Sequence, residues 1–161
     1  MRHRWPGIIG TATATLAIVV LSVVLGACGG GGHSSSSPTT VPEALWLGQA
    51  RVWVAAHGPD LTAISDAAKN LGDAAKSGNG NLSQIAATQF LVKVGQADGD
   101  LPTNDFGHDL HKVFIAYASA LTMIRNGIVK NDQRLYKQGS DALAAAVKQF
   151  GAITARMNAS P

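Results

Sequence analysis

The sequence predicts an all-α protein in which residues 42–161 form an antiparallel, up-down-up-down four-helix bundle. Apolar residues recur at three- and four-residue steps in four separate stretches, which is the period of an amphipathic helix. No stretch alternates apolar and polar residues over a useful length, as a half-buried strand would. Segments of turn residues, such as 77–80 and 131–132, separate the stretches and are short enough to join antiparallel neighbours.

The first stretch, residues 42–76, predicts one long helix that is kinked near Pro59. Thr40 and Glu43 have the spacing of a capping box, with Pro42 in the first turn. The apolar pattern keeps its phase across Gly58-Pro59, so one bent helix is favoured over two separate helices. The residues expected to face inward are Leu45, Trp46, Gln49, Val52, Trp53, Ala56, Leu61, Ile64, Ala68, Leu71 and Ala75.

The second stretch predicts a helix that begins near Asn81, because Gln84 follows at the spacing of a capping signal. It ends at Asp98-Gly99, where turn residues interrupt the pattern. The stripe expected to be buried consists of Leu82, Ile85, Gln89 and Val92, with Ala86 and Phe90 on its flank.

The third and fourth stretches complete the predicted bundle. Thr103, Asn104 or Asp105 is expected to cap the third helix, and Asn131-Asp132 precedes the fourth. Small residues in the fourth helix should allow it to approach its neighbours closely. The predicted stripes are Phe106, Leu110, Val113, Tyr117, Leu121, Ile124 and Ile128, and then Leu135, Gly139, Ala142, Ala146, Phe150, Ile153 and Met157.

The N-terminal segment has the features of an export signal. Arg2 and Arg4 precede an uncharged, largely apolar run from Ile8 to Leu25. The run is long enough that a retained transmembrane anchor is an alternative to a cleaved signal. Leu25-Gly26-Ala27-Cys28 resembles the lipobox of bacterial lipoproteins, and it favours cleavage. The resemblance implies that the thiol of Cys28 is lipidated and that residues 1–27 are removed.

The lipobox resemblance also sets the expected location and the domain boundaries. Residues 28–41, which contain the lipidated cysteine and a Gly-, Ser- and Thr-rich segment, are expected to form a flexible tether. The bundle of residues 42–161 is then held by its lipid at the extracytoplasmic face of the cell membrane. With nine aspartates, one glutamate and much Ala and Gly, the chain is similar to small actinobacterial envelope lipoproteins.

Composition argues against several functions. Without Arg2 and Arg4 the formal net charge falls from +3 to +1, so no basic surface for nucleic acid is indicated. Lipidation would use the only cysteine, and no nucleophile motif is present. The single glutamate, Glu43, argues against a carboxylate-bridged di-metal centre. We therefore expect a non-enzymatic protein without a cofactor.

Two small groups of residues are candidate binding sites. His108 and His111 are three residues apart and could share a metal ion, but helical spacing places one toward solvent and the other on a flank, which makes a metal site the weaker interpretation. Aromatic residues could instead contact an apolar ligand such as a lipid or haem, although large core anchors are the simpler interpretation. These residues are Trp46, Trp53, Phe90 and Phe114.

Two functional hypotheses follow from the sequence. The first is an accessory lipoprotein whose bundle docks onto another protein of the cell envelope. The second is a bundle that holds an apolar small molecule between its helices. A protein partner found by cross-linking in intact cells would favour the first hypothesis. A large apolar cavity beside the four aromatic residues would favour the second, and a well-filled core would count against it.

Overall fold

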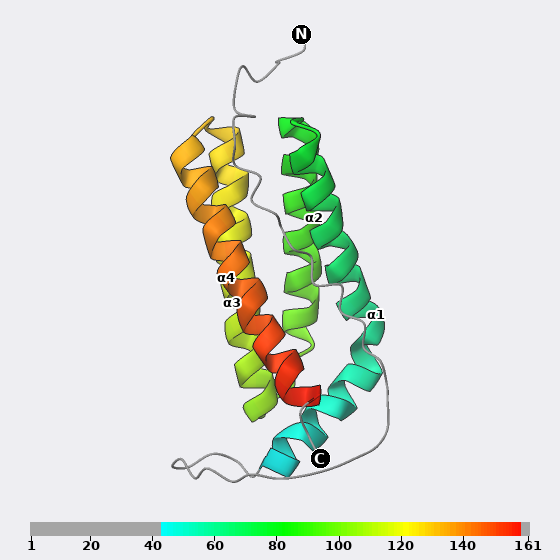
Figure 1. Ribbon diagram of the computed structural model, residues 1–161. Coiled ribbons are helices and arrows are strands. Elements are labelled where there is room, and N and C mark those ends of the chain that lie inside the picture. Colours follow the sequence, from blue (N-terminus) through cyan, green and yellow to red (C-terminus); the bar gives the residue numbers. More distant parts are fainter. Residues whose placement is uncertain (1–42, 159–161) are drawn as a thin grey trace.

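The computed structural model describes residues 43–158, and these residues form an all-α four-helix bundle (Figure 1). The helices are α1 (Glu43–Lys76), α2 (Gly80–Gly99), α3 (Asp105–Val129) and α4 (Gln133–Asn158). No strand occurs in this part of the chain. The predicted fold class is confirmed, whereas the predicted leader and tether, including Cys28, lie outside the described residues.

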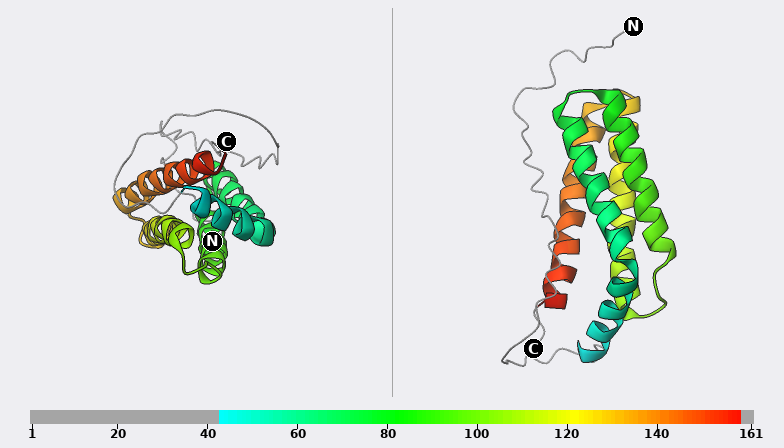
Figure 2. Two further views of the ribbon diagram at one scale, coloured as in Figure 1. Left: turned by 90° about the horizontal axis from the view of Figure 1, so that it is seen from below. Right: turned by 90° about the vertical axis from the view of Figure 1, so that its right-hand side faces the viewer.

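Helices that follow one another in the chain lie side by side, as two views show (Figures 1 and 2). The most extensive contacts join α3 to α4, α1 to α2 and α2 to α3. In contrast, α1 and α4 contact each other sparsely, near the first residues of α1 and the last residues of α4. The connection between α1 and α4 therefore depends on a few side chains at one end of the molecule.

The kink of α1 is confirmed. His57 has φ −112° and ψ 20°, so the helical conformation is interrupted two residues before Pro59. Proline lacks an N–H group and its ring clashes with the carbonyl of the preceding turn, which is the usual cause of such a bend. The helix continues to Lys76, as its apolar pattern predicted.

Three side-chain caps begin the later helices. Asn79 caps α2 by accepting a hydrogen bond from the N–H of Leu82 at 3.2 Å. Asn104 caps α3 by accepting from Gly107 at 2.9 Å, and Asp132 accepts from Leu135 at 2.9 Å at the start of α4. Asn104 is one of the three residues predicted to cap the third helix, and Asp132 belongs to the Asn131-Asp132 pair predicted to precede the fourth. The prediction of Asn81 as the second cap is wrong. The cap is Asn79, two residues earlier, and α2 begins at Gly80.

The core is formed mainly by α1, α2 and α3. The predicted stripe of α3 is buried from Phe106 to Ile124, while Ile128 is partly buried against the core. In α4, Leu143 and Ala146 are buried, and the larger residues Phe150, Ile153 and Met157 are only partly buried. This pattern fits a helix that is covered closely by α3 and only slightly by α1.

The predicted buried face of α2 is wrong. Leu82, Ile85 and Val92 are exposed by 49%, 54% and 52%, although they were expected to face the core. The buried residues of α2 are instead the two expected flank residues, Ala86 and Phe90, together with Ser83, Ala87, Val94 and Ala97. Both sets have helical spacing, and the small alanines allow α2 to lie closer to α1 and α3 than the branched residues would.

Four residues of α1 that were expected to face inward are exposed: Leu45, Val52, Ala56 and Ala75. Leu47 and Ala50 instead take buried positions beside Trp46 and Trp53. The buried stripe of this segment is therefore rotated by about one residue from the predicted one.

Glycines allow α3 and α4 to pack closely. A Cβ atom at Gly139 would lie 2.7 Å from the backbone nitrogen of Ile124 and 2.9 Å from the carbonyl oxygen of Ala120. A Cβ at Gly127 would lie 2.5 Å from the backbone nitrogen of Tyr136. Because the obstructing atoms belong to backbone, they cannot move aside without shifting a helix. The predicted close approach of α4 through Gly139 is confirmed.

We predict that Gly139→Ala destabilises the protein by about 1–3 kcal/mol, because the added methyl group forces α3 and α4 apart. Gly151→Ala is the matched control in the same helix, since a Cβ there would meet nothing within 4 Å. That control should gain up to about 1 kcal/mol from the higher helix propensity of alanine. Urea unfolding followed by circular dichroism measures both changes. Equal effects of the two substitutions would contradict the packing argument.

Candidate functional site

The four aromatic residues proposed as ligand contacts are buried in the core. Trp46, Trp53, Phe90 and Phe114 are all exposed by 5% or less. Trp46 meets Phe106 edge-on, with ring centroids 5.4 Å apart, and Trp53 lies 5.8 Å from the same ring. Each buried ring of this size stabilises the fold by about 2–3 kcal/mol. The observed contacts are those of core anchors.

Tyr117 belongs to the same core. Its ring lies 5.7 Å from that of Phe90 and 6.4 Å from that of Phe150. Burial disfavours the charged phenolate and raises the pKa of Tyr117 to about 12. Its hydroxyl therefore stays protonated at neutral pH.

The two candidate metal ligands do not form a three-residue cluster. His108 is exposed, and His111 is paired with another residue: its Nδ1 lies 2.6 Å from the carboxylate of Asp98. In residues 43–158, the structure brings together one group of three potential ligand side chains, and this group contains neither His108 nor His111. The surface interpretation of His108 and His111 thus agrees with their exposure.

Trp46 is the centre of a polar junction between α1, α3 and α4. Its indole Nε1 donates a hydrogen bond of 3.1 Å to Asp109, which lies in the first turns of α3. The guanidinium of Arg156, near the end of α4, stacks over the Trp46 ring at 3.8 Å from its centroid. Arg156 also donates to both carboxylate oxygens of Glu43, at 2.9 and 2.7 Å. We call these four residues, Glu43, Trp46, Asp109 and Arg156, the Trp46 junction.

The charges in the Trp46 junction stabilise one another. Hydrogen bonds from Arg156 lower the pKa of Glu43 below its usual value, and the same contacts raise the pKa of Arg156. Arg156 lies 3.5 Å from Asp109, so this second pairing is weaker. The cation–π contact contributes about 0.5–1 kcal/mol, and the partly exposed ion pair contributes less than about 1 kcal/mol.

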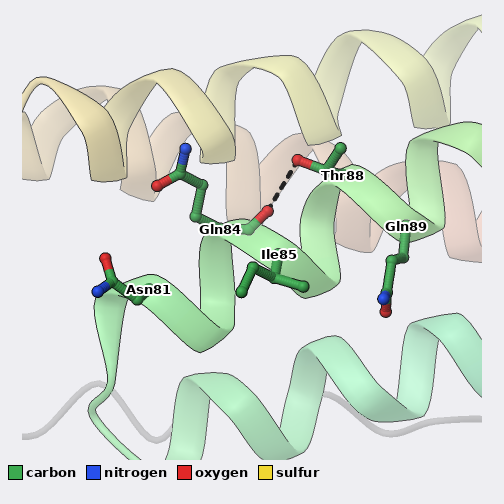
Figure 3. Close-up of a pocket in the computed structure, with 5 residues that line it drawn as sticks. All are labelled: Asn81, Gln84, Ile85, Thr88 and Gln89. Atoms are coloured by element: carbon green, nitrogen blue, oxygen red, sulfur yellow. Dashed lines mark hydrogen bonds between the residues drawn. The ribbon is translucent and has the colours of Figure 1, made fainter.

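The outward side of α2 carries no charged residue along most of its length. From Gly80 to Val92 the helix carries no charged residue, although half of these positions face solvent. A hollow that is open to solvent lies on this helix (Figure 3). It is lined by Asn81, Gln84, Ile85, Thr88 and Gln89. We call the exposed residues Leu82, Ile85, Thr88, Gln89 and Val92 the α2 outer face.

Four residues of the α2 outer face were expected from the sequence to lie in the core: Leu82, Ile85, Gln89 and Val92. Apolar residues occur on two sides of α2, so periodicity alone cannot choose the buried side. The absence of charge over thirteen residues was the available signal, because an exposed helix normally carries Lys or Glu on its solvent side.

Comparisons with protein families, curated proteins and solved structures found no match for this chain. Within residues 43–158, none of the helices has the length and apolar character needed to span a bilayer. Functional inference for this protein therefore depends on the features of its own sequence and surface.

We predict that the Trp46 junction makes stability depend on pH. A carboxylate whose pKa is lowered in the folded state adds stability above its unfolded pKa of about 4.3, and this stability is lost as the pH falls through the folded pKa. The free energy of unfolding of the wild type should exceed that of Glu43→Gln by less than about 1 kcal/mol at pH 7, and by almost nothing at pH 2.5. Urea unfolding at both pH values measures the difference. A difference that is the same at both pH values would contradict this assignment.

Proposed function

We propose that this protein is a lipid-anchored lipoprotein of the cell envelope that binds another protein through the α2 outer face. The proposed role is non-enzymatic. The lipobox-like sequence that ends at Cys28 supports the anchor and the extracytoplasmic location, and the surface of α2 supports the interaction. The observation that carries the proposal is the exposed, uncharged and partly apolar face of a stable helix.

The α2 outer face has the size and composition of a helix-docking surface. Leu82, Ile85 and Val92 recur at steps of three and seven residues, and they extend over about 15 Å of the helix. Each is about half exposed, so binding can remove further apolar area from water. Thr88 and Gln89 lie between them and supply hydrogen-bonding groups that fix the orientation of a partner.

The chemistry of this face selects the type of partner. A charged partner surface would lose its hydration against Leu82, Ile85 and Val92 without gaining an opposite charge. Binding of anionic lipid headgroups is also disfavoured, because α2 carries one basic residue, Lys93. We therefore propose an uncharged, apolar protein surface, such as the apolar stripe of a helix in a neighbouring envelope protein.

We favour protein binding over the alternative of an apolar small ligand. That alternative needs Trp46, Trp53, Phe90 and Phe114 to line a space for a lipid or haem. The four rings are buried and pack against other core residues, whereas the hollow on α2 is lined by different side chains.

We predict that Cys28 is the site of lipidation. Cells that express the full chain and are fed an alkyne-bearing fatty acid should incorporate the label into the wild type. Cys28→Ser should lose the label and keep residues 1–27, which mass spectrometry detects. Ser36→Ala, eight residues further along, is the control and should be labelled and processed normally. A labelled Cys28→Ser chain would contradict the assignment.

We predict that the α2 outer face contacts a protein in cells. A photo-crosslinking amino acid at position 85 of the full chain should form an adduct with another protein. The same amino acid at position 115 is the matched control, because Ile115 on α3 is equally exposed, at 54%. Adding Val92→Lys to the position-85 variant should reduce the adduct by about tenfold or more, because it buries a charge in the interface.

The identity of the adduct distinguishes the possible occupants of this face. An adduct with a different protein that forms at position 85 and not at position 115 supports the proposal. An adduct of two copies of this chain, an adduct with lipid, or equal crosslinking at both positions would overturn it.

A further inference from the structure

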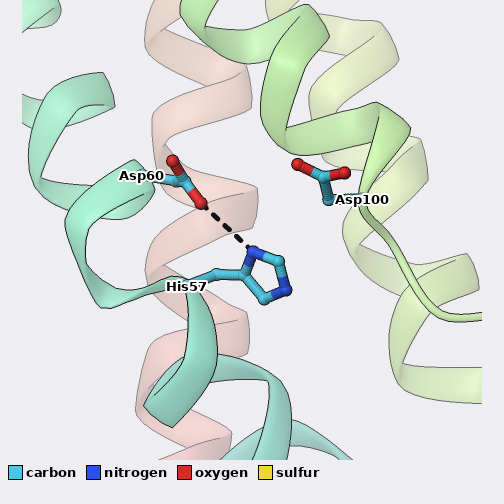
Figure 4. Close-up of side chains that lie close together, drawn as sticks. All are labelled: His57, Asp60 and Asp100. Carbon is cyan, nitrogen blue, oxygen red and sulfur yellow. Dashed lines mark hydrogen bonds and ion pairs between the residues drawn. The ribbon is translucent and has the colours of Figure 1, made fainter.

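The bend of α1 places a histidine beside two carboxylates from different parts of the chain. His57 is at the bend, Asp60 lies one turn later in α1, and Asp100 follows the end of α2 (Figure 4). One potential ligand atom from each residue lies within 4.8 Å of the other two. Asp60 is the closer neighbour, with its carboxylate 3.1 Å from Nδ1 of His57. We propose that His57, Asp60 and Asp100 bind one divalent first-row transition-metal ion, such as Zn²⁺.

The surroundings of the cluster restrict the orientation of its histidine. The His57 ring stacks on the buried indole of Trp53, with centroids 4.7 Å apart and planes inclined by 17°. The non-helical φ and ψ of His57 set the direction in which its side chain leaves the backbone. A ring that is held by packing loses less conformational entropy when it binds a ligand.

The same indole also holds the segment that carries Asp100. Nε1 of Trp53 donates a hydrogen bond of 3.0 Å to the backbone carbonyl of Asp100. One buried side chain therefore positions ligands from α1 and from the α2–α3 connection. This arrangement resembles the supporting contacts that orient ligands in metal sites, although here the support comes through stacking and the backbone.

The dimensions of the cluster suit a small metal ion. Zinc binds histidine nitrogen and carboxylate oxygen at about 2.0–2.2 Å, so ligand atoms of a tetrahedral site lie about 3.4 Å apart. Closing the cluster from 4.8 Å requires small rotations of the side chains of Asp60, which is partly buried, and Asp100, which is exposed. Three protein ligands leave at least one coordination position for water.

The charges and ligand types favour a transition metal. In residues 43–158, no lysine or arginine pairs with Asp60 or Asp100, so a divalent cation would offset two neighbouring carboxylates. Imidazole suits Zn²⁺, Ni²⁺ and Cu²⁺, whereas Mg²⁺ and Ca²⁺ prefer sites made of oxygen alone. The site has no local sequence signature, because Asp100 is 40 residues beyond Asp60 and the two meet only where α1 and α2 lie side by side.

Calorimetric titration of the full chain with ZnCl₂ tests the proposal. We expect a site of one ion per chain whose affinity falls by about tenfold or more in Asp100→Asn. This substitution retains the side-chain shape and the backbone carbonyl that Trp53 contacts. Asp98→Asn is the matched control two residues away, because Asp98 pairs with the exposed His111. It should leave the affinity unchanged.

Quenching of tryptophan fluorescence by CuCl₂ provides a second measurement. Cu²⁺ bound at His57 would lie beside Trp53, so saturable quenching is expected in the wild type and should be largely lost in His57→Gln. His111→Gln should quench like the wild type, and circular dichroism verifies that all variants are folded. The proposal is overturned if the wild type shows no saturable binding of Zn²⁺ or Cu²⁺. It is equally overturned if Asp100→Asn and His57→Gln both bind like the wild type.

Discussion

Arg156 lies across the indole of Trp46 and bonds to Glu43, and these contacts close the end of the bundle where α1 meets α4. Along the rest of their length the two helices contact each other little, and α4 is held mainly by α3. A hydrogen bond from Trp46 to Asp109 brings the start of α3 to the same point. The Trp46 junction therefore connects three helices through four side chains. Of these, Trp46 is also buried in the core, and Glu43 is the first residue of α1.

The packing of the core next to the Trp46 junction positions both proposed binding surfaces. Phe106 contacts Trp46 and Trp53, and Trp53 in turn orients His57 and the backbone of Asp100. On α2, small alanines face the core and allow close packing, so Leu82, Ile85 and Val92 remain on the outside. The interaction surface and the proposed metal site are thus consequences of how the core is filled.

The sequence predicted features that depend on local spacing and failed where two arrangements had the same spacing. The stripe of α3 and the kink near Pro59 were predicted correctly, and Asn104 was one of the three candidates for the cap of α3, because each feature is determined within a few residues. On α2 two apolar stripes compete, and only packing against α1 and α3 decides between them. Glu43 and Arg156 are 113 residues apart, so their ion pair has no local signature. The same is true of Asp60 and Asp100, which meet because α1 and α2 lie side by side.

The Trp46 junction, rather than continuous packing, holds α4 to α1. Hydrogen–deuterium exchange of Arg156→Ala, measured peptide by peptide, is the sharpest test of this role. We expect faster exchange in residues 146–158 and in the first turns of α1, with unchanged protection in residues 120–139, where Gly127 and Gly139 hold α3 to α4. Unchanged exchange in residues 146–158, or an equal loss of protection throughout the bundle, would contradict the claim.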